Sequence, residues 1–190
     1  AGADSVGLSG VDGGLLTGPR KSAVRVLEDG TKKIKRGDHS GKITDVNSDL
    51  LDSLLDDGYT PVVSVPMLGE DDDEVLAVNA DADRSAAAVA GALGAELVVL
   101  TDVAGIYADP NDPETLIESA ATPEELESVK DAAEGFMMKK VMAATEALEG
   151  GAPAVHVGDA NRDAPVTDAL DGAGTKIEAS ALADNGEITQ

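Results

Sequence analysis

The feature that most constrains the fold is an apolar run at residues 96–101, "ELVVLT", which follows an alanine-rich segment closed by Gly94. Consecutive apolar residues of this kind are typical of a strand buried on both faces in a parallel sheet. The alanine-rich segment, from about Asp81 to Leu93, has the composition of a helix, and glycine is suited to end it. A helix that leads directly into such a strand indicates an α/β domain.

The same alternation continues along the chain. Further helices are expected at residues 45–59, 122–135, 137–151 and 164–172, and further strands at 60–68, 152–159, 174–179 and a segment ending near Asn79. Residues 6–36 indicate short strands separated by glycines, and the Asp29-Gly30 pair predicts a hairpin. Thr122 with Glu125 predicts a capping box. The sequence therefore predicts one α/β domain with a mostly parallel, helix-covered open sheet and an inserted β-hairpin ribbon.

The charge of the chain is strongly acidic, with 37 acidic and 14 basic residues and a formal net charge of -23. Such a field repels phosphate and argues against nucleic-acid binding. Acidic residues spread along a chain with few lysines favour a surface adapted to concentrated salt. With no cysteine, no apolar run long enough for a membrane and no basic-then-apolar leader, a soluble cytoplasmic protein is expected.

Basic residues are concentrated in one segment, since 8 of the 14 lie within residues 20–42. On charge alone, a solvated face of the ribbon explains them. The functional interpretation is a docking surface for an acidic partner.

Polar residues follow three of the expected strands, where ligands bind in open α/β sheets. One strand leads to Asn79, Asp81 and Asp83, another to Thr101 and Asp102, and a third to Gly158 and Asp159. A helix cap accounts for one of the two aspartates near residue 82, but not for both together with Asn79.

Lys139 and Lys140 are adjacent on an otherwise apolar helical segment, so at least one is expected to point inward, while the alternative is that both reach solvent. A lysine near a carboxylate and an anionic ligand suits phosphoryl transfer. The glycine-rich stretches at 7–10 and 10–14 match no phosphate-loop motif, His39 and His156 are isolated, and no His/Cys cluster indicates a metal.

The stretch "VNADADRSAAAVAGALGAELVVLTDVAGIY" resembles the amino acid kinase superfamily. Within it, the chain is most similar to N-acetylglutamate kinases and to the [LysW]-aminoadipate/[LysW]-glutamate kinases, which act on a carrier-bound amino acid. The segments "VGLSGVDGGLLTGPRK", "KKIKRGDHSGKITDVNSDLL", "GFMMKKVMAATEAL" and "GTKI" support the resemblance in the same order. It implies a three-layer αβα sandwich and ATP-dependent phosphorylation of a side-chain carboxylate to an acyl phosphate, with magnesium accompanying ATP.

The resemblance also implies residue roles. Asp83 matches the aspartate that organises the catalytic lysines, and Lys140 matches the lysine that stabilises the transferring phosphoryl group. Asn79 matches the substrate-holding asparagine, and Asp81 stands where N-acetylglutamate kinases usually have a second asparagine. The residues matching the nucleotide-binding site are Thr101, Asp102, Val103, Gly105, Ile106, Tyr107 and Glu134.

The carrier-linked branch gives the basic segment a candidate role, because its substrate is joined to a small acidic amino-group carrier protein. The residues expected to receive the carrier are Lys32, Lys33, Lys35, Arg36 and Lys42. A homodimer is expected from family members.

One departure from the family pattern concerns the start of the chain. The family's first strand, glycine-rich phosphate loop with its lysine, and substrate-gripping glycine pair and arginine have no counterpart here, so residues 1–190 are expected to be the C-terminal two-thirds of a single amino acid kinase domain. The alternatives are an N-acetylglutamate kinase that uses the free substrate and a truncated nucleotide-binding remnant without activity. A uridylate or carbamate kinase fits the "NADAD" and "GFMMKKV" segments less well.

Overall fold

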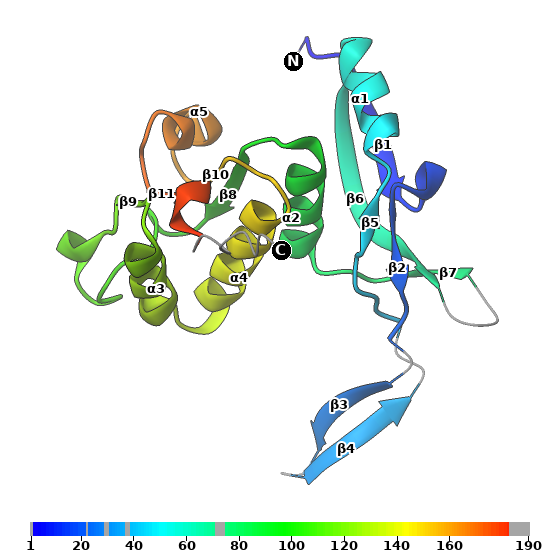
Figure 1. Cartoon of the computed structure of the whole chain (residues 1–190), viewed down its shortest axis with the longest axis horizontal. Coiled ribbons are helices and arrows are strands. Elements are labelled where there is room, and N and C mark those ends of the chain that lie inside the picture. Colours follow the sequence, from blue (N-terminus) through cyan, green and yellow to red (C-terminus); the bar gives the residue numbers. More distant parts are fainter. Residues whose placement is uncertain (1, 22, 29–30, 37–38, 71–74, 183–190) are drawn as a thin grey trace, which may run out of the picture. The chain divides into compact units, whose positions relative to one another are not determined.

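The computed structural model describes residues 2–21, 23–28, 31–36, 39–70 and 75–182, and the side chains of 23–28, 31–36 and Phe136 lie outside that description. The chain divides into two compact units, Ala1–Ala88 and Val89–Gln190, with the division inside a helix. Figure 1 shows the elements of each unit, which are described separately below.

The first unit is mainly β-structure. Its elements are β1 (Ser5–Gly10), a 3-10 turn (Asp12–Gly14), β2 (Leu16–Pro19), β3 (Ala23–Glu28), β4 (Thr31–Arg36), β5 (Asp45–Val46), α1 (Ser48–Asp56), β6 (Thr60–Glu70) and β7 (Val75–Val78). Helix α2 (Ala82–Leu93) begins in this unit and ends in the next.

The second unit alternates helices and strands. Its elements are β8 (Leu97–Thr101), a 3-10 turn (Pro113–Thr115), β9 (Ser119–Ala120), α3 (Pro123–Ala132), α4 (Gly135–Glu149), β10 (Ala154–Asp159), α5 (Pro165–Leu170), β11 (Thr175–Glu178) and a closing 3-10 turn (Ala179–Ala181).

The sheet of the first unit is organised around β6. This strand lies parallel to β1 and β2 and antiparallel to β7, while β2 pairs antiparallel with β5. Met67 on β6, Leu16 on β2 and Val78 on β7 are among its fully buried side chains. Strands β3 and β4 form a separate antiparallel ribbon, which confirms the predicted hairpin (Figure 1). The Asp29-Gly30 turn lies outside the described residues.

The sheet of the second unit has the order β8-β10-β11-β9. Strand β10 is parallel to β8 and antiparallel to β11, and residues 154–158 of β10 are all buried. This burial matches the apolar runs that indicated a covered, parallel sheet. The predicted α/β fold is confirmed: β6 lies between two parallel partners in the first sheet, and in the second sheet the parallel pairs β8–β10 and β9–β11 flank the antiparallel pair β10–β11.

The segment 45–59 was predicted as one helix, but this prediction was too long. Asp45–Val46 forms β5, which pairs antiparallel with β2, and the helix begins only at Ser48. The reason is Asn47, whose side chain accepts a hydrogen bond from the Leu50 N–H at 3.3 Å and so caps the helix. Gly58 ends the helical region in a left-handed conformation, as expected.

The capping box on α3 is formed as predicted. The Thr122 hydroxyl accepts the Glu125 N–H, and the Glu125 carboxylate accepts the N–H groups of Ala121 at 2.8 Å and Thr122 at 3.1 Å. These backbone donors, Ala121 first, hold the pKa of Glu125 below its ordinary value.

Glu125 should therefore contribute to acid sensitivity. A depressed carboxyl pKa gives stability that is present above the unfolded-state pKa and lost as pH falls through the folded-state value. We expect acidification from neutral pH to about pH 3 to destabilise the wild-type protein more than Glu125→Gln. Urea unfolding at both pH values measures this difference, and equal acid sensitivity of the two proteins would contradict it.

Candidate active site

A cavity of about 320 Å³ in the second unit lies where β8 ends. All seven residues predicted to bind the nucleotide line it, and so does Lys140. The complete lining is Thr101, Asp102, Val103, Gly105, Ile106, Tyr107, Pro110, Ala132, Glu134, Met137 and Lys140. Sequence reasoning missed Pro110, Ala132 and Met137, whose small or apolar side chains carry no chemical signal.

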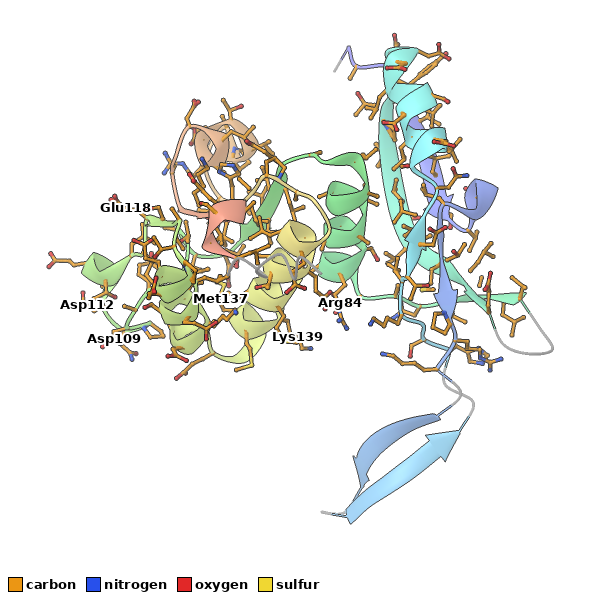
Figure 2. The ribbon with its side chains drawn as sticks, in the orientation of Figure 1. Arg84, Asp109, Asp112, Glu118, Met137 and Lys139 are labelled. Atoms are coloured by element: carbon orange, nitrogen blue, oxygen red, sulfur yellow. The ribbon has the colours of Figure 1, made fainter. Side chains whose placement is uncertain are left out.

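Two parts of the chain build this cavity. The segment after β8 supplies one wall, and it folds back on itself through hydrogen bonds from the Ile117 N–H to the Ile106 carbonyl at 2.8 Å and from the Ala108 N–H to the Thr115 carbonyl at 2.9 Å. The junction of α3 and α4 supplies the other wall. Figure 2 labels Met137 on α4, together with Asp109 and Asp112 on the segment after β8. The segment after β8 is thus a hydrogen-bonded hairpin.

The two adjacent lysines of α4 have different surroundings. Lys140 is half-buried and lines the cavity, one helical turn after Met137. Lys139, which Figure 2 labels, is exposed and is not part of the lining. Residues three apart share a helix face, which explains why Met137 and Lys140 reach the same cavity. The expectation that at least one lysine points inward therefore applies to Lys140.

The two aspartates at the start of α2 also have different places. Asp81 is the helix cap: its carboxylate accepts the Arg84 N–H at 3.1 Å, and its carbonyl accepts the Ser85 hydroxyl at 2.8 Å. Asp83 lies in the first helical turn and is half-buried. Helix capping therefore accounts for Asp81 but does not account for Asp83.

Asn79 is fixed through its backbone. Its N–H donates to the His39 carbonyl at 2.6 Å, and its carbonyl accepts the Gly41 N–H at 2.9 Å. The next residue after Gly41 is the exposed Lys42, whose N–H donates to the Pro19 carbonyl at 3.1 Å. The predicted substrate residue and one predicted carrier-docking residue are thus neighbours in the first unit. The side chains of the other docking residues, Lys32, Lys33, Lys35 and Arg36, lie outside the described part, although β4 carries their backbone.

The lining of the cavity combines apolar side chains with one lysine and two carboxylates. Val103, Ile106 and Met137 offer apolar contacts, and the Lys140 ammonium offers positive charge. Across the residues that the structure describes, no group of three or more His, Asp or Glu side chains could hold a metal ion.

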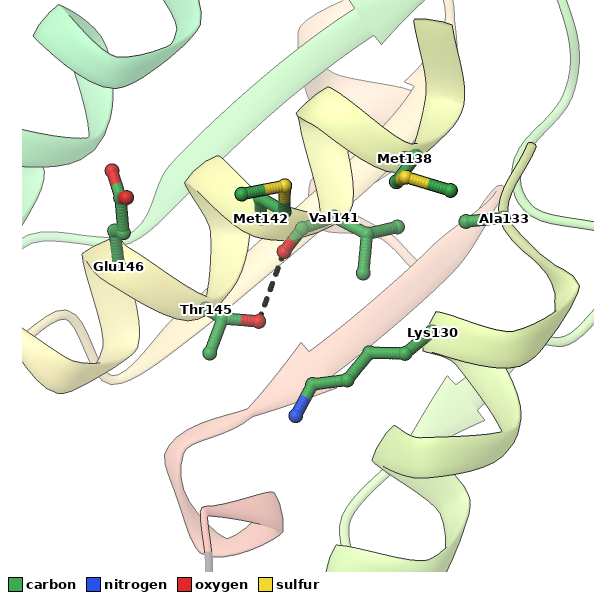
Figure 3. Close-up of a pocket in the computed structure, with 7 residues that line it drawn as sticks. All are labelled: Lys130, Ala133, Met138, Val141, Met142, Thr145 and Glu146. Atoms are coloured by element: carbon green, nitrogen blue, oxygen red, sulfur yellow. Dashed lines mark hydrogen bonds between the residues drawn. The ribbon is translucent and has the colours of Figure 1, made fainter. Parts of the chain in front are cut away.

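Another cavity, of about 420 Å³, lies between α3 and α4 (Figure 3). Met138, Val141 and Met142 line it on α4, and Lys130 extends along it from α3. The Thr145 hydroxyl at its edge donates to the Val141 carbonyl at 2.9 Å. Helix α4 therefore borders both cavities, with Lys140 on the side of the first.

His156 is isolated in the sequence and is buried in β10. Its Nδ1 lies 3.2 Å from the Ala169 carbonyl and its Nε2 lies 3.1 Å from a Glu96 carboxylate oxygen. Both ring nitrogens are engaged within the second unit, away from the residues that line the cavity beside Lys140.

The cavity that Lys140 lines lies at the carboxyl end of a strand, the place where open α/β folds bind their ligands. Residues 1–159 match the family model described as the amino acid kinase family, and the chain belongs to that family.

Among the described helices, none is long and apolar enough to cross a membrane.

Curated relatives carry kinase names. The chain is 42% identical over 182 residues to "[LysW]-aminoadipate kinase" of Thermus thermophilus, covering 93% of this chain and 65% of the relative. It is 41% identical to the protein of that name from Deinococcus radiodurans, covering 93% and 59%. It is 46% identical over 158 residues to "Acetylglutamate kinase" of Acidothermus cellulolyticus, covering 82% and 51%. The chain thus spans less than two-thirds of the length of these relatives.

Solved structures share the fold. N-acetylglutamate synthase from Neisseria gonorrhoeae, complexed with coenzyme A and N-acetyl-glutamate, matches with a TM-score of 0.69 and 27% identity over 98% of this chain and 42% of that one. Carbamate kinase from Giardia lamblia bound to AMP-PNP matches with a TM-score of 0.60 and 19% identity, over 82% and 52%. At 19% identity, the similarity to the carbamate kinase structure shows a shared fold only.

Proposed function

We propose that the protein transfers a phosphoryl group from ATP to the side-chain carboxylate of glutamate or 2-aminoadipate whose amino group is held by a carrier protein, giving an acyl phosphate in arginine or lysine biosynthesis. The observation that carries this proposal is the single cavity lined by Lys140 and by the seven residues predicted to bind the nucleotide. The names of relatives at 41 to 42% identity over 93% of the chain support the substrate.

Each candidate residue has a role that phosphoryl transfer requires. This reaction depends on positioning and charge neutralisation rather than on covalent chemistry with the protein. Lys140 stabilises the charge on the transferring group, Asp83 aligns the catalytic lysines, and Asn79 holds the amino-acid substrate together with Asp81. Magnesium would accompany ATP and would neutralise part of the charge on its phosphates.

The basic segment is proposed to receive the carrier. In a chain of net charge -23, a local group of cations creates a field opposite to that of the remaining surface and attracts an acidic protein. Lys42 is exposed, and the N–H of the preceding residue, Gly41, donates a hydrogen bond to the Asn79 carbonyl. Lys42 therefore lies close to the Asn79 backbone. A carrier bound here would bring its attached amino acid to the predicted substrate residue.

Charge reversal tests this docking surface. We expect Lys33→Glu combined with Arg36→Glu to raise KM for the carrier-bound substrate about 10-fold at low ionic strength, because like charges then face the acidic carrier. KM for ATP should change little. Added salt should bring the variant and wild-type values together, since exposed charges are screened beyond a Debye length.

The control for this experiment is Lys130→Glu, which reverses one exposed charge on α3 in the second unit. It should leave KM for the carrier-bound substrate near the wild-type value. An unchanged KM in the double variant would remove the docking proposal and leave the phosphoryl-transfer proposal intact.

A second candidate function is N-acetylglutamate kinase activity on the free substrate. The 46% identity to an acetylglutamate kinase over 158 residues favours it. The replacement of asparagine by Asp81 and the basic segment favour the carrier-linked reaction.

Parallel assays separate these candidates. ATP consumption is measured with carrier-bound glutamate, carrier-bound 2-aminoadipate and free N-acetyl-L-glutamate, and we expect turnover with the carrier-bound substrates. Turnover only with free N-acetyl-L-glutamate would establish the second candidate. Nucleotide binding without turnover on any of them would indicate a nucleotide-binding remnant. The proposal also includes a homodimer, which light scattering on the same protein measures.

A further inference from the structure

The segment after β8 supplies most of the candidate nucleotide cavity, and a residue far along the chain holds it in place. Ile106 and Ile117 face each other as an antiparallel pair in this hairpin, but only one of the two hydrogen bonds of such a pair is direct. The Ile117 N–H reaches the Ile106 carbonyl at 2.8 Å. The reciprocal bond is replaced by a side chain.

That side chain is Thr175, the first residue of β11. Its hydroxyl accepts the Ile106 N–H at 2.8 Å and donates to the Ile117 carbonyl at 2.6 Å. Thr175 is 2% exposed, so solvent does not replace these bonds when the hydroxyl is lost. One buried hydroxyl thus satisfies a donor and an acceptor on both sides of the hairpin.

The fit between the hairpin and Thr175 is close. A Cβ atom at Gly105 would lie 2.7 Å from the Thr175 hydroxyl oxygen and 3.0 Å from the Thr175 nitrogen. A Cβ atom at Gly174, where φ is +123°, would lie 3.0 Å from the Ala104 carbonyl oxygen. Glycine at both positions lets the hairpin approach β11, and Gly105 has a packing reason as well as its predicted nucleotide contact.

We propose that Thr175 is a positioning residue for nucleotide binding, because its hydroxyl fixes Ile106 and with it the wall of the cavity formed by residues 102–107. This inference rests on the proposed function, since it assigns the cavity to ATP. Thr175 is not among the residues that line the cavity, so its effect acts through the hairpin.

Three variants of the full-length protein test the proposal. Thr175→Val keeps the shape of the side chain and removes both hydrogen bonds, whereas Thr175→Ser keeps the hydroxyl. Thr145→Val is the matched control, because it removes a hydroxyl that bonds only a carbonyl of its own helix, bordering the other cavity. All are compared at a temperature where circular dichroism shows each to be folded.

The first readout is ATP binding by calorimetry, with KM for ATP and for the acceptor measured separately. We expect Thr175→Val to weaken ATP binding about 10-fold, with little change in KM for the acceptor, and Thr175→Ser to recover most of the loss. The second readout is hydrogen exchange of residues 102–117 without nucleotide, which should accelerate in Thr175→Val and not in Thr145→Val.

The outcomes separate the two proposals. Equal ATP affinity in Thr175→Val and the wild-type protein, or equal losses in Thr175→Val and Thr145→Val, would overturn the positioning role. Failure of Thr175→Ser to recover binding would overturn it as well. If the wild-type protein itself binds no ATP, the proposed function fails before any variant is compared, and the positioning role fails with it.

Discussion

Asp83→Asn is expected to lower turnover by about 100-fold or more while the affinity for ATP changes little. The substitution keeps the shape of the side chain and removes its charge. Asp81 already caps α2, so the loss at Asp83 falls on alignment of the reacting groups rather than on the helix end. An interaction that matters only in the transition state lowers kcat and kcat/KM by the same factor.

The measurement for Asp83 is steady-state kinetics on the full-length protein with its preferred acceptor, together with calorimetric binding of ATP. Asp52→Asn is the matched control, since it makes the same change at an exposed position on α1 in the same unit. It should keep wild-type kcat. Wild-type turnover in Asp83→Asn would refute the assignment of this aspartate to the reaction.

Lys140→Ala is expected to reduce kcat by about 100- to 1,000-fold, because it removes positive charge from a half-buried position in the cavity. A positioned charge that meets the charge developing in the transition state contributes on this scale in other enzymes. Single-turnover phosphoryl transfer is the preferred measurement, since it separates the chemical step from product release.

The neighbouring lysine provides the control for Lys140. Lys139→Ala removes the same charge from an exposed position outside the cavity lining, and should change kcat only a few-fold. A larger loss in Lys139→Ala than in Lys140→Ala would reverse the assignment within the pair. Lys140→Arg adds a second comparison: it retains charge but replaces a compact ammonium by a planar group, so partial activity would separate charge from geometry.

Much of the fold was accessible from local signals in the sequence. The apolar run before Thr101, the capping pair of Thr122 and Glu125, and Gly94 after α2 each produce the predicted element. The short strands β5 and β9 were missed. Each has only two residues, which are too few to show a periodicity, and each is defined by its pairing with a neighbouring strand. The order of strands in each sheet also depends on pairing between segments that are distant in the sequence, which local signals do not show.

The candidate site was predictable in part. Six of the seven residues predicted to bind the nucleotide lie at or just after the end of β8, whereas Glu134 directly precedes α4. The resemblance to the family predicted them together with Lys140. Periodicity alone left Lys139 and Lys140 equivalent. The resemblance favoured Lys140, and in the structure Lys140 is the half-buried member of the pair that lines the cavity. Thr175 could not be found in this way, since a threonine in a strand is ordinary and its two partners lie 58 and 69 residues away.

The cap on α2 has an evolutionary consequence. Asparagine and aspartate cap helices almost equally well. The carboxylate of Asp81 that accepts the Arg84 N–H can therefore be exchanged with an amide without weakening the helix. Evolution can exchange aspartate and asparagine at this position by a single change, which alters the charge at the start of α2 and preserves the scaffold of the helix.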